Sequence, residues 1–259
     1  MKHKAKLIAD RLPCVLSSWD AVECISLNET AHEDTLNPYF ALIFDVFYKG
    51  NIPHADERQA MFGEDLVAFE TSHKSSKDRF LIGDYPIRIE YKATCKVESL
   101  VAIADTKLES LWFIKDSGTY GFYRLQHGSI LFSRNAWIEN IRDRLSHLSD
   151  DFWFQIRQAH QSKMEHLLND LGQAFFLEDD FNYLISEALF IKTACLTLFC
   201  VNRHFEPSHR AYYKQVVTLP ILPEAFRTHL DMLLRFNAEI TKERQYSIAQ
   251  LIAKSIVIL

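Results

Sequence analysis

Glycine and proline are scarce in this chain of 259 residues, which has 7 of each, and all seven glycines lie between Gly50 and Gly172. This scarcity excludes collagen-like and other low-complexity classes. The sequence contains no glycine-rich phosphate motif of the GxGxxG or P-loop type and no GxSxG nucleophile motif. The five cysteines are odd in number and include no CxxC pair. We therefore expect no zinc site, and we expect reduced thiols in a cytoplasmic protein.

The chain also has no strong charge of one sign. It contains 29 Lys and Arg and 34 Asp and Glu, for a net charge of −5. A dedicated duplex-DNA binder is usually basic, so nucleic acid is an unlikely partner, although the sequence does not exclude it. The most apolar run, 188–201, is interrupted by Lys192. It is shorter than the roughly 20 residues that span a bilayer, so we expect no membrane partner. The share of hydrophobic residues, 48%, is that of a globular protein.

The first part of the chain mixes strand and helix patterns. Four runs rich in aromatic and branched residues predict β-strands: 41–48, 86–92, 111–115 and 119–124. Between them, the segment after Pro53 predicts a helix that ends at Gly63. An α+β domain is therefore expected over residues 1–132.

From Ser133 onward the apolar residues recur three and four apart, which is typical of helices. Ser133 and Ser149 stand where N-caps are expected. The segment 181–202 is apolar nearly all round, so it predicts the buried central helix of a bundle. Turn-forming residues then separate three further helices. An α-helical bundle domain is expected over residues 133–259.

Two of the predicted strands carry a carboxylate among apolar residues, Asp45 in 41–48 and Glu90 in 86–92. Burial of an unpaired carboxylate costs several kcal/mol, so each needs a cation, hydrogen bonds or a pocket. Side chains alternate along a strand, which places Asp45 on the face of Phe47, and Glu90 on the face of Arg88 and Lys92. If the two strands are neighbours, the carboxylates meet and suit Mg²⁺ with a bound triphosphate. In the alternative interpretation, Asp45 caps a turn or pairs with Arg88, and Glu90 lies on a solvated edge.

Four segments carry a resemblance to a known family: 19–29, 37–58, 77–92 and 198–208. They resemble the nucleotidyltransferase superfamily, with its DNA polymerase β-like fold, and more narrowly a bacterial two-domain branch with a C-terminal helical domain. This resemblance implies a mixed sheet with flanking helices, followed by helices that hold an acceptor. It also implies transfer of a nucleoside monophosphate (NMP) from a nucleoside triphosphate (NTP) to an unknown acceptor, with Mg²⁺ as cofactor.

The resemblance assigns roles to individual residues. Asp45 and Glu90 match the catalytic, metal-binding carboxylates of the family, with Glu33 or Asp34 completing the metal site from the preceding loop. The remaining candidates are for nucleotide binding: Arg79, Arg88, Lys92, Asn202 and Arg203. For the first three, the alternative is a solvated strand surface. For Asn202 and Arg203, the alternative is capping of a helix C-terminus.

The chain also departs from the family pattern. In the family, a Gly-Ser turn precedes the first carboxylate strand, but here no glycine precedes Gly50 and the segment 32–35 stands in that place. The second carboxylate of the family's D-x-D arrangement falls at Phe47, which cannot bind a metal. Two functions therefore stay open: NMP transfer, and a catalytically degenerate member that acts as a nucleotide- or partner-binding module.

Overall fold

The structure, a computed structural model, describes residues 3–28, 41–72, 74, 76–234 and 240–259. The chain divides into two compact units, the first formed by Met1–Leu111 with Gly121–His147, and the second by Trp112–Tyr120 with Leu148–Leu259. Each unit has its own apolar core.

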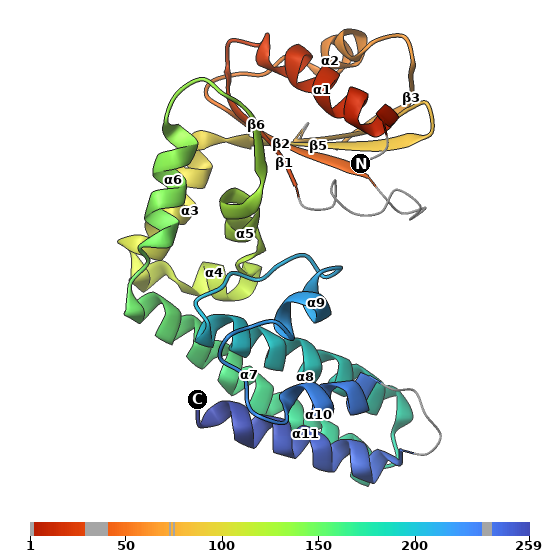
Figure 1. The fold of residues 1–259 in the computed structure, drawn as a ribbon, viewed down its shortest axis with the longest axis vertical. Coiled ribbons are helices and arrows are strands. Elements are labelled where there is room, and N and C mark those ends of the chain that lie inside the picture. Colours follow the sequence, from red (N-terminus) through yellow and green to blue (C-terminus); the bar gives the residue numbers. More distant parts are fainter. Residues whose placement is uncertain (1–2, 29–40, 73, 75, 235–239) are drawn as a thin grey trace. The chain divides into compact units, whose positions relative to one another are not determined.

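The first unit is built around a mixed six-stranded sheet with the strand order β3-β4-β5-β2-β1-β6 (Figure 1). Strands β2 and β5 are parallel, and the other neighbouring pairs are antiparallel. The strands are β1 (Val22–Leu27), β2 (Leu42–Tyr48), β3 (Leu66–Thr71), β4 (Lys77–Ile82), β5 (Tyr85–Ala93) and β6 (Ser129–Ser133). The helices around them are α1 (His3–Ser17), α2 (Ala55–Phe62), α3 (Thr94–Asp105), α5 (Tyr120–His127) and α6 (Trp137–Ser146), with a 3₁₀ turn at Leu108–Ser110. The expected α+β architecture is confirmed.

Helices α1 and α2 cover the apolar face of the sheet (Figure 1). The buried side chains of α1 recur three and four residues apart: Ala5, Ile8, Ala9, Leu12 and Leu16. This spacing turns one stripe of the helix toward the sheet. Helix α2 follows Pro53 as expected; Glu57 accepts a hydrogen bond from the backbone of His54 at its start, and Gly63, with a φ of 107°, ends it.

Two strand predictions are wrong. The run 111–115 lies mostly in the helix α4 (Trp112–Ser117), and the run 119–124 lies mostly in α5. Aromatic residues favour strands only where a pleated surface is there to receive them, and tertiary context overrides such a preference in short segments. In α4 the buried apolar side chain is Ile114, whereas Trp112 is 63% exposed.

The segment around Ser133 also differs from the expected one. Ser133 is not an N-cap but the last residue of β6, which pairs with β1. Helix α6 begins only at Trp137, whose backbone N–H donates to the side chain of Asn135 at 2.9 Å. Both β6 and α6 belong to the first compact unit, which runs to His147, whereas the earlier segment Trp112–Tyr120 belongs to the second.

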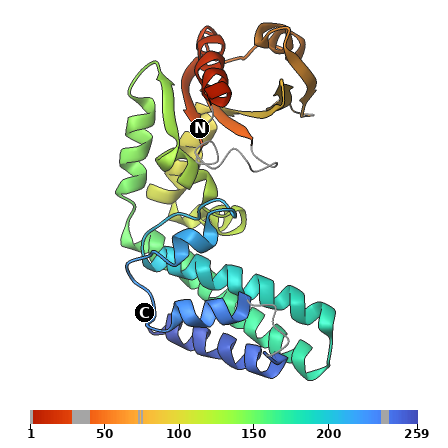
Figure 2. The same cartoon turned by 45° about the vertical axis from the view of Figure 1, so that its right-hand side comes forward.

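The second unit is helical and confirms the expected run of C-terminal helices. It contains α4, α7 (Asp150–Phe176), α8 (Asp180–Val201), α9 (Tyr212–Val216), α10 (Phe226–Leu234) and α11 (Lys242–Val257). Helices α7 and α8 form a hairpin, and α11 packs along both (Figures 1 and 2). Side-chain oxygens of Ser149, Asp179 and Thr241 accept backbone N–H groups at the starts of α7, α8 and α11.

Helix α8 supplies much of this core, with Phe190, Leu198 and Phe199 almost fully buried. In the part of the chain that the structure describes, it is the one helix long and apolar enough to cross a membrane, judged by length and composition alone. In its most apolar window, 56% is buried inside the protein, as in the core helix of a bundle. Its buried threonines, Thr193 and Thr197, donate to backbone carbonyls of the preceding turn.

Candidate functional site

The face of the sheet opposite α1 and α2 is charged. In the parallel pair β2–β5, Asp45 lies directly opposite Glu90, so the two side chains share this face. In the antiparallel pair β4–β5, Lys77 lies opposite Glu90, and Arg79 opposite Arg88. We call this surface the charged face; its residues are Asp45, Glu70, Lys77, Arg79, Arg88, Glu90 and Lys92 from the strands, with Arg124 from α5. Five cations and three carboxylates give it a positive surplus, although the whole chain carries −5.

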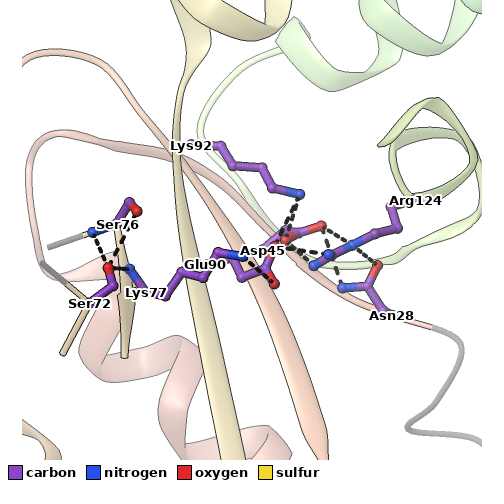
Figure 3. Close-up of polar contacts among 8 residues, drawn as sticks. All are labelled: Asn28, Asp45, Ser72, Ser76, Lys77, Glu90, Lys92 and Arg124. Carbon is purple, nitrogen blue, oxygen red and sulfur yellow. Dashed lines mark hydrogen bonds and ion pairs between the residues drawn. The ribbon is translucent and has the colours of Figure 1, made fainter. Parts of the chain in front are cut away.

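Arg124 binds both carboxylates (Figure 3). Its Nε donates to Asp45 Oδ2 at 3.0 Å, its second terminal nitrogen donates to Asp45 Oδ1, and its first donates to Glu90 Oε2 at 2.9 Å. Asn28 accepts from Nε at 3.2 Å and itself donates to Asp45 at 3.4 Å. The Asp45 side chain is fully buried, so this charge-assisted network is what compensates its loss of water.

Two lysines add to the neutralisation. Lys92 Nζ lies 2.9 Å from Asp45 Oδ1 and 3.8 Å from Glu90 Oε2, and Lys77 Nζ lies 3.7 Å from Glu90 Oε1. Burial alone would raise the pKa of Glu90, but the attraction of Arg124, Lys92 and Lys77 outweighs burial and holds this pKa below its usual value. Glu90 is therefore held as an anion, and the partners of both carboxylates are protein cations.

Arg79 and Arg88 are arranged differently. They lie side by side across β4 and β5, where directly opposed side chains stand about 5 Å apart at Cβ. Neither forms an ion pair with any residue that the structure describes. Like charges in this position repel each other and destabilise the sheet. An anion held between them would remove that penalty.

A buried network behind the charged face fixes β4 and β5 in place. Arg58, from α2, is 1% exposed and donates to both carboxylate oxygens of Asp78 at 2.8 Å. It also donates to the carbonyl of Pro53 and to the hydroxyl of Thr71. Tyr91 donates to Asp78 at 2.7 Å, and burial, with the neighbouring Asp78 carboxylate, raises the pKa of Tyr91 well above its usual value.

The predicted site residues fall into three groups. Asp45, Glu90, Arg79, Arg88 and Lys92 share the charged face; alternation along the sequence placed Glu90 with Arg88 and Lys92, and the strand register adds Asp45 and Arg79. Glu33 and Asp34 lie outside the described residues. The third group, Asn202 and Arg203, lies at the end of α8 in the second unit.

Asn202 and Arg203 lie at the C-terminal end of α8, where Asn202 is the C-cap. The Asn202 amide donates to the carbonyls of Leu198 and Ile221, and its oxygen accepts from the backbone of Ile221 at 2.8 Å. Arg203 has a φ of 54°, in the left-handed region, and pairs with Asp150 at 2.7 Å on the surface. The capping alternative therefore describes Asn202, and a role of either residue in nucleotide binding is an untested prediction.

The sequence did not point to Arg124. It lies in a run predicted as a strand, and nothing in its neighbours predicts a buried arginine. The one available signal was indirect: two buried carboxylates on one face require cations, and Lys92 supplies only one charge.

The described residues do not offer a free carboxylate pair to a Mg²⁺ ion. Mg²⁺ takes about six oxygen ligands at about 2.1 Å, usually several waters with one or two carboxylates and substrate phosphates. Among the residues that the structure describes, no group of three or more His, Cys, Asp or Glu side chains is placed to hold a metal. The oxygens of Asp45 and Glu90 accept instead from Arg124 and Lys92.

Comparison with known proteins supports the fold. No family model matches the chain, and no curated protein matches it in sequence. Among solved structures, the chain is similar to a nucleotidyltransferase-like protein from Exiguobacterium sibiricum 255-15, with a TM-score of 0.51 and 10% identity. The match covers 98% of this chain and 74% of that one.

A mixed sheet with flanking helices, followed by a helical unit, defines the architectural class of this protein. The chain has a nucleotidyltransferase-like fold, and the resemblance seen in its sequence is confirmed at the level of the fold.

Proposed function

We propose that this protein is a nucleotide-binding module with a nucleotidyltransferase-like fold, and that its charged face holds the phosphates of the nucleotide without a divalent cation. The observation that carries this proposal is the pair Arg79 and Arg88, adjacent across β4 and β5 and without an ion pair among the described residues. Arginine binds phosphate oxygens through a planar fork of donors, so two adjacent guanidinium groups suit a polyphosphate.

The electrostatics of the face support an anionic ligand. Because Asp45 and Glu90 are already neutralised by Arg124 and Lys92, they repel a phosphate group only weakly. Lys77, whose side chain is 49% exposed, adds a further positive charge directly opposite Glu90. A positive patch on a chain of net negative charge also steers anions toward that patch.

A second function has one specific observation in its favour. Asp45 and Glu90 are in register on one face of two parallel strands, which is the placement that NMP transfer from an NTP to an acceptor would use. This function needs Mg²⁺, and it would require both carboxylates to exchange their present cations for the metal. Phe47, fully buried against Trp137 with ring centroids 5.2 Å apart, supplies no ligand at the next position on that face.

Nucleotide binding with and without Mg²⁺ separates the two functions. ATP, GTP, CTP and UTP are titrated in turn against the full chain, in EDTA and in Mg²⁺, with wild type and Arg88→Ala. One charge-assisted hydrogen-bonding partner is worth about 1.5–3 kcal/mol, so we expect Arg88→Ala to weaken binding about 10- to 100-fold. Lys107→Ala, which removes an exposed cation of the same unit away from the charged face, is the matched control and should bind like wild type.

Binding in EDTA that Arg88→Ala weakens would support the metal-free module. Binding that requires Mg²⁺ and is lost in Asp45→Asn would favour NMP transfer instead. If none of the four nucleotides binds under either condition, both proposals fail.

A further inference from the structure

The Arg124 side chain is held in place by burial and by several hydrogen bonds. Only 10% of its side chain is exposed, and its guanidinium makes hydrogen bonds to Asp45, Glu90 and Asn28. A planar fork that reaches two carboxylates at once has little freedom to move without breaking several charge-assisted bonds.

The helix that carries Arg124 is fixed as well. The N–H of Gly128 donates to the carbonyl of Arg124 at 2.9 Å, just beyond the end of α5. A Cβ at Gly128 would lie 2.8 Å from that carbonyl and 3.1 Å from Ser26 Oγ, so only glycine allows α5 to end this close to β1. Arg142, from α6, donates to the carbonyls of Leu125 and Gly128 and holds the same turn from the other side.

The network carries no uncompensated negative charge. Asp45 and Glu90 contribute two negative charges, and three cations, Arg124, Lys92 and Lys77, lie within 4 Å of them. A divalent cation is attracted to a carboxylate pair by the uncompensated charge on that pair. Here that attraction is absent, and the guanidinium nitrogens occupy the space between the carboxylate oxygens.

We propose that Arg124 is a specificity-determining residue that acts as a built-in cation: it fills the position between Asp45 and Glu90, excludes divalent cations from the pair, and leaves phosphate as the ligand of the charged face. This inference deepens the proposed function and rests on it for the phosphate, whereas the exclusion of cations is a property of the protein alone. Without Arg124, the same two carboxylates become a cation site.

The experiment uses divalent cations alone, with no nucleotide. Mg²⁺ and Mn²⁺ are titrated by calorimetry against the full-length wild type, Arg124→Ala, and the double variant Arg124→Ala with Asp45→Asn. We expect no cation binding at the pair in wild type. Arg124→Ala should bind Mn²⁺ about tenfold or more tightly than wild type, since the guanidinium leaves the position between the carboxylates and one of the three positive charges beside them is removed. The double variant should lose this gain, and Lys107→Ala should behave like wild type.

Two results would overturn the inference: Mn²⁺ binding to wild type that Asp45→Asn removes, or a folded Arg124→Ala protein with no gain in cation binding. Circular dichroism shows whether each variant is folded. If Arg124→Ala does not fold, Arg124→Met keeps the length of the side chain without its charge and takes its place. Mn²⁺-induced line broadening in wild-type NMR spectra needs no variant, and broadening centred on Asp45 and Glu90 would overturn the inference directly.

Failure of this inference and failure of the proposed function are distinguishable. Nucleotide titrations in EDTA report phosphate binding whether or not the pair excludes cations. A wild type that binds nucleotide in EDTA and also binds Mn²⁺ at Asp45 would preserve the proposed function and remove the role of Arg124.

Discussion

Replacing Arg58 by alanine should destabilise the first unit strongly, because it leaves the buried Asp78 carboxylate without its cationic partner. In the wild type, the Asp78 side chain is fully buried and accepts two hydrogen bonds from Arg58 at 2.8 Å and one from Tyr91 at 2.7 Å. In Arg58→Ala only the Tyr91 bond remains. The acceptors at Pro53 and Thr71 also lose their donor.

Removing one partner of a buried ion pair costs about 3–5 kcal/mol, since the remaining charge is uncompensated. For a unit of this size, that corresponds to a fall in melting temperature of about 10–15 °C. The measurement is urea and thermal unfolding of the full chain, followed by circular dichroism. Binding of nucleotide should weaken in parallel, because β4 and β5 carry the arginines of the charged face.

Arg11→Ala is the matched control. Arg11 pairs with Asp65 at 3.1 Å, but both side chains are about half exposed, so this ion pair should contribute less than about 1 kcal/mol. If Arg58→Ala unfolds within 1 kcal/mol of wild type, as Arg11→Ala should, the reasoning about the buried network is refuted.

Three further predictions concern the second unit. Burial lowers the pKa of His160 from 6.5 to about 4, so the folded state favours the neutral ring; stability is full above pH 6.5 and falls by on the order of 3 kcal/mol as the pH drops toward 4. Urea midpoints across this range should fall in wild type and stay flatter in His160→Leu, and equal slopes would contradict the assignment. Gly118→Ala should cost about 1–3 kcal/mol, because φ is 78° and a Cβ would lie 2.7 Å from the buried Glu206 carboxylate; a melting temperature equal to that of wild type would disprove it. Ser149→Ala should cost about 1 kcal/mol through loss of the N-cap of α7, whereas Ser149→Asp should keep it, as unfolding midpoints will show.

Much of the fold could be predicted from local pattern. The runs around Asp45 and Glu90 are apolar over a strand's length, and they form β2 and β5. Period-two alternation correctly put Glu90 with Arg88 and Lys92, and the sheet register then brought Asp45 to the same face. The long helices were predictable because their caps, such as Ser149, and their apolar spacing act within a few residues of sequence.

What could not be predicted depends on contacts between distant segments. Arg124 lies 79 positions from Asp45 and 34 from Glu90, and no local pattern encodes that meeting. The helices α4 and α5 have aromatic sequences typical of strands, yet neither pairs with a strand of the sheet. The role of Ser133 could not be predicted for the same reason, since β6 completes a sheet whose other strands lie far earlier in the chain.

The most direct test of the central claim is to observe the two arginines while a nucleotide binds. The side-chain Nε–Hε resonances of Arg79 and Arg88, assigned through Arg79→Lys and Arg88→Lys, are followed by NMR during titration with each NTP in EDTA. The account predicts that at least one nucleotide shifts both resonances in the absence of any divalent cation, while the resonance of Arg124 stays in place. Shifts that appear only with Mg²⁺, or that leave Arg79 and Arg88 unchanged, would contradict it.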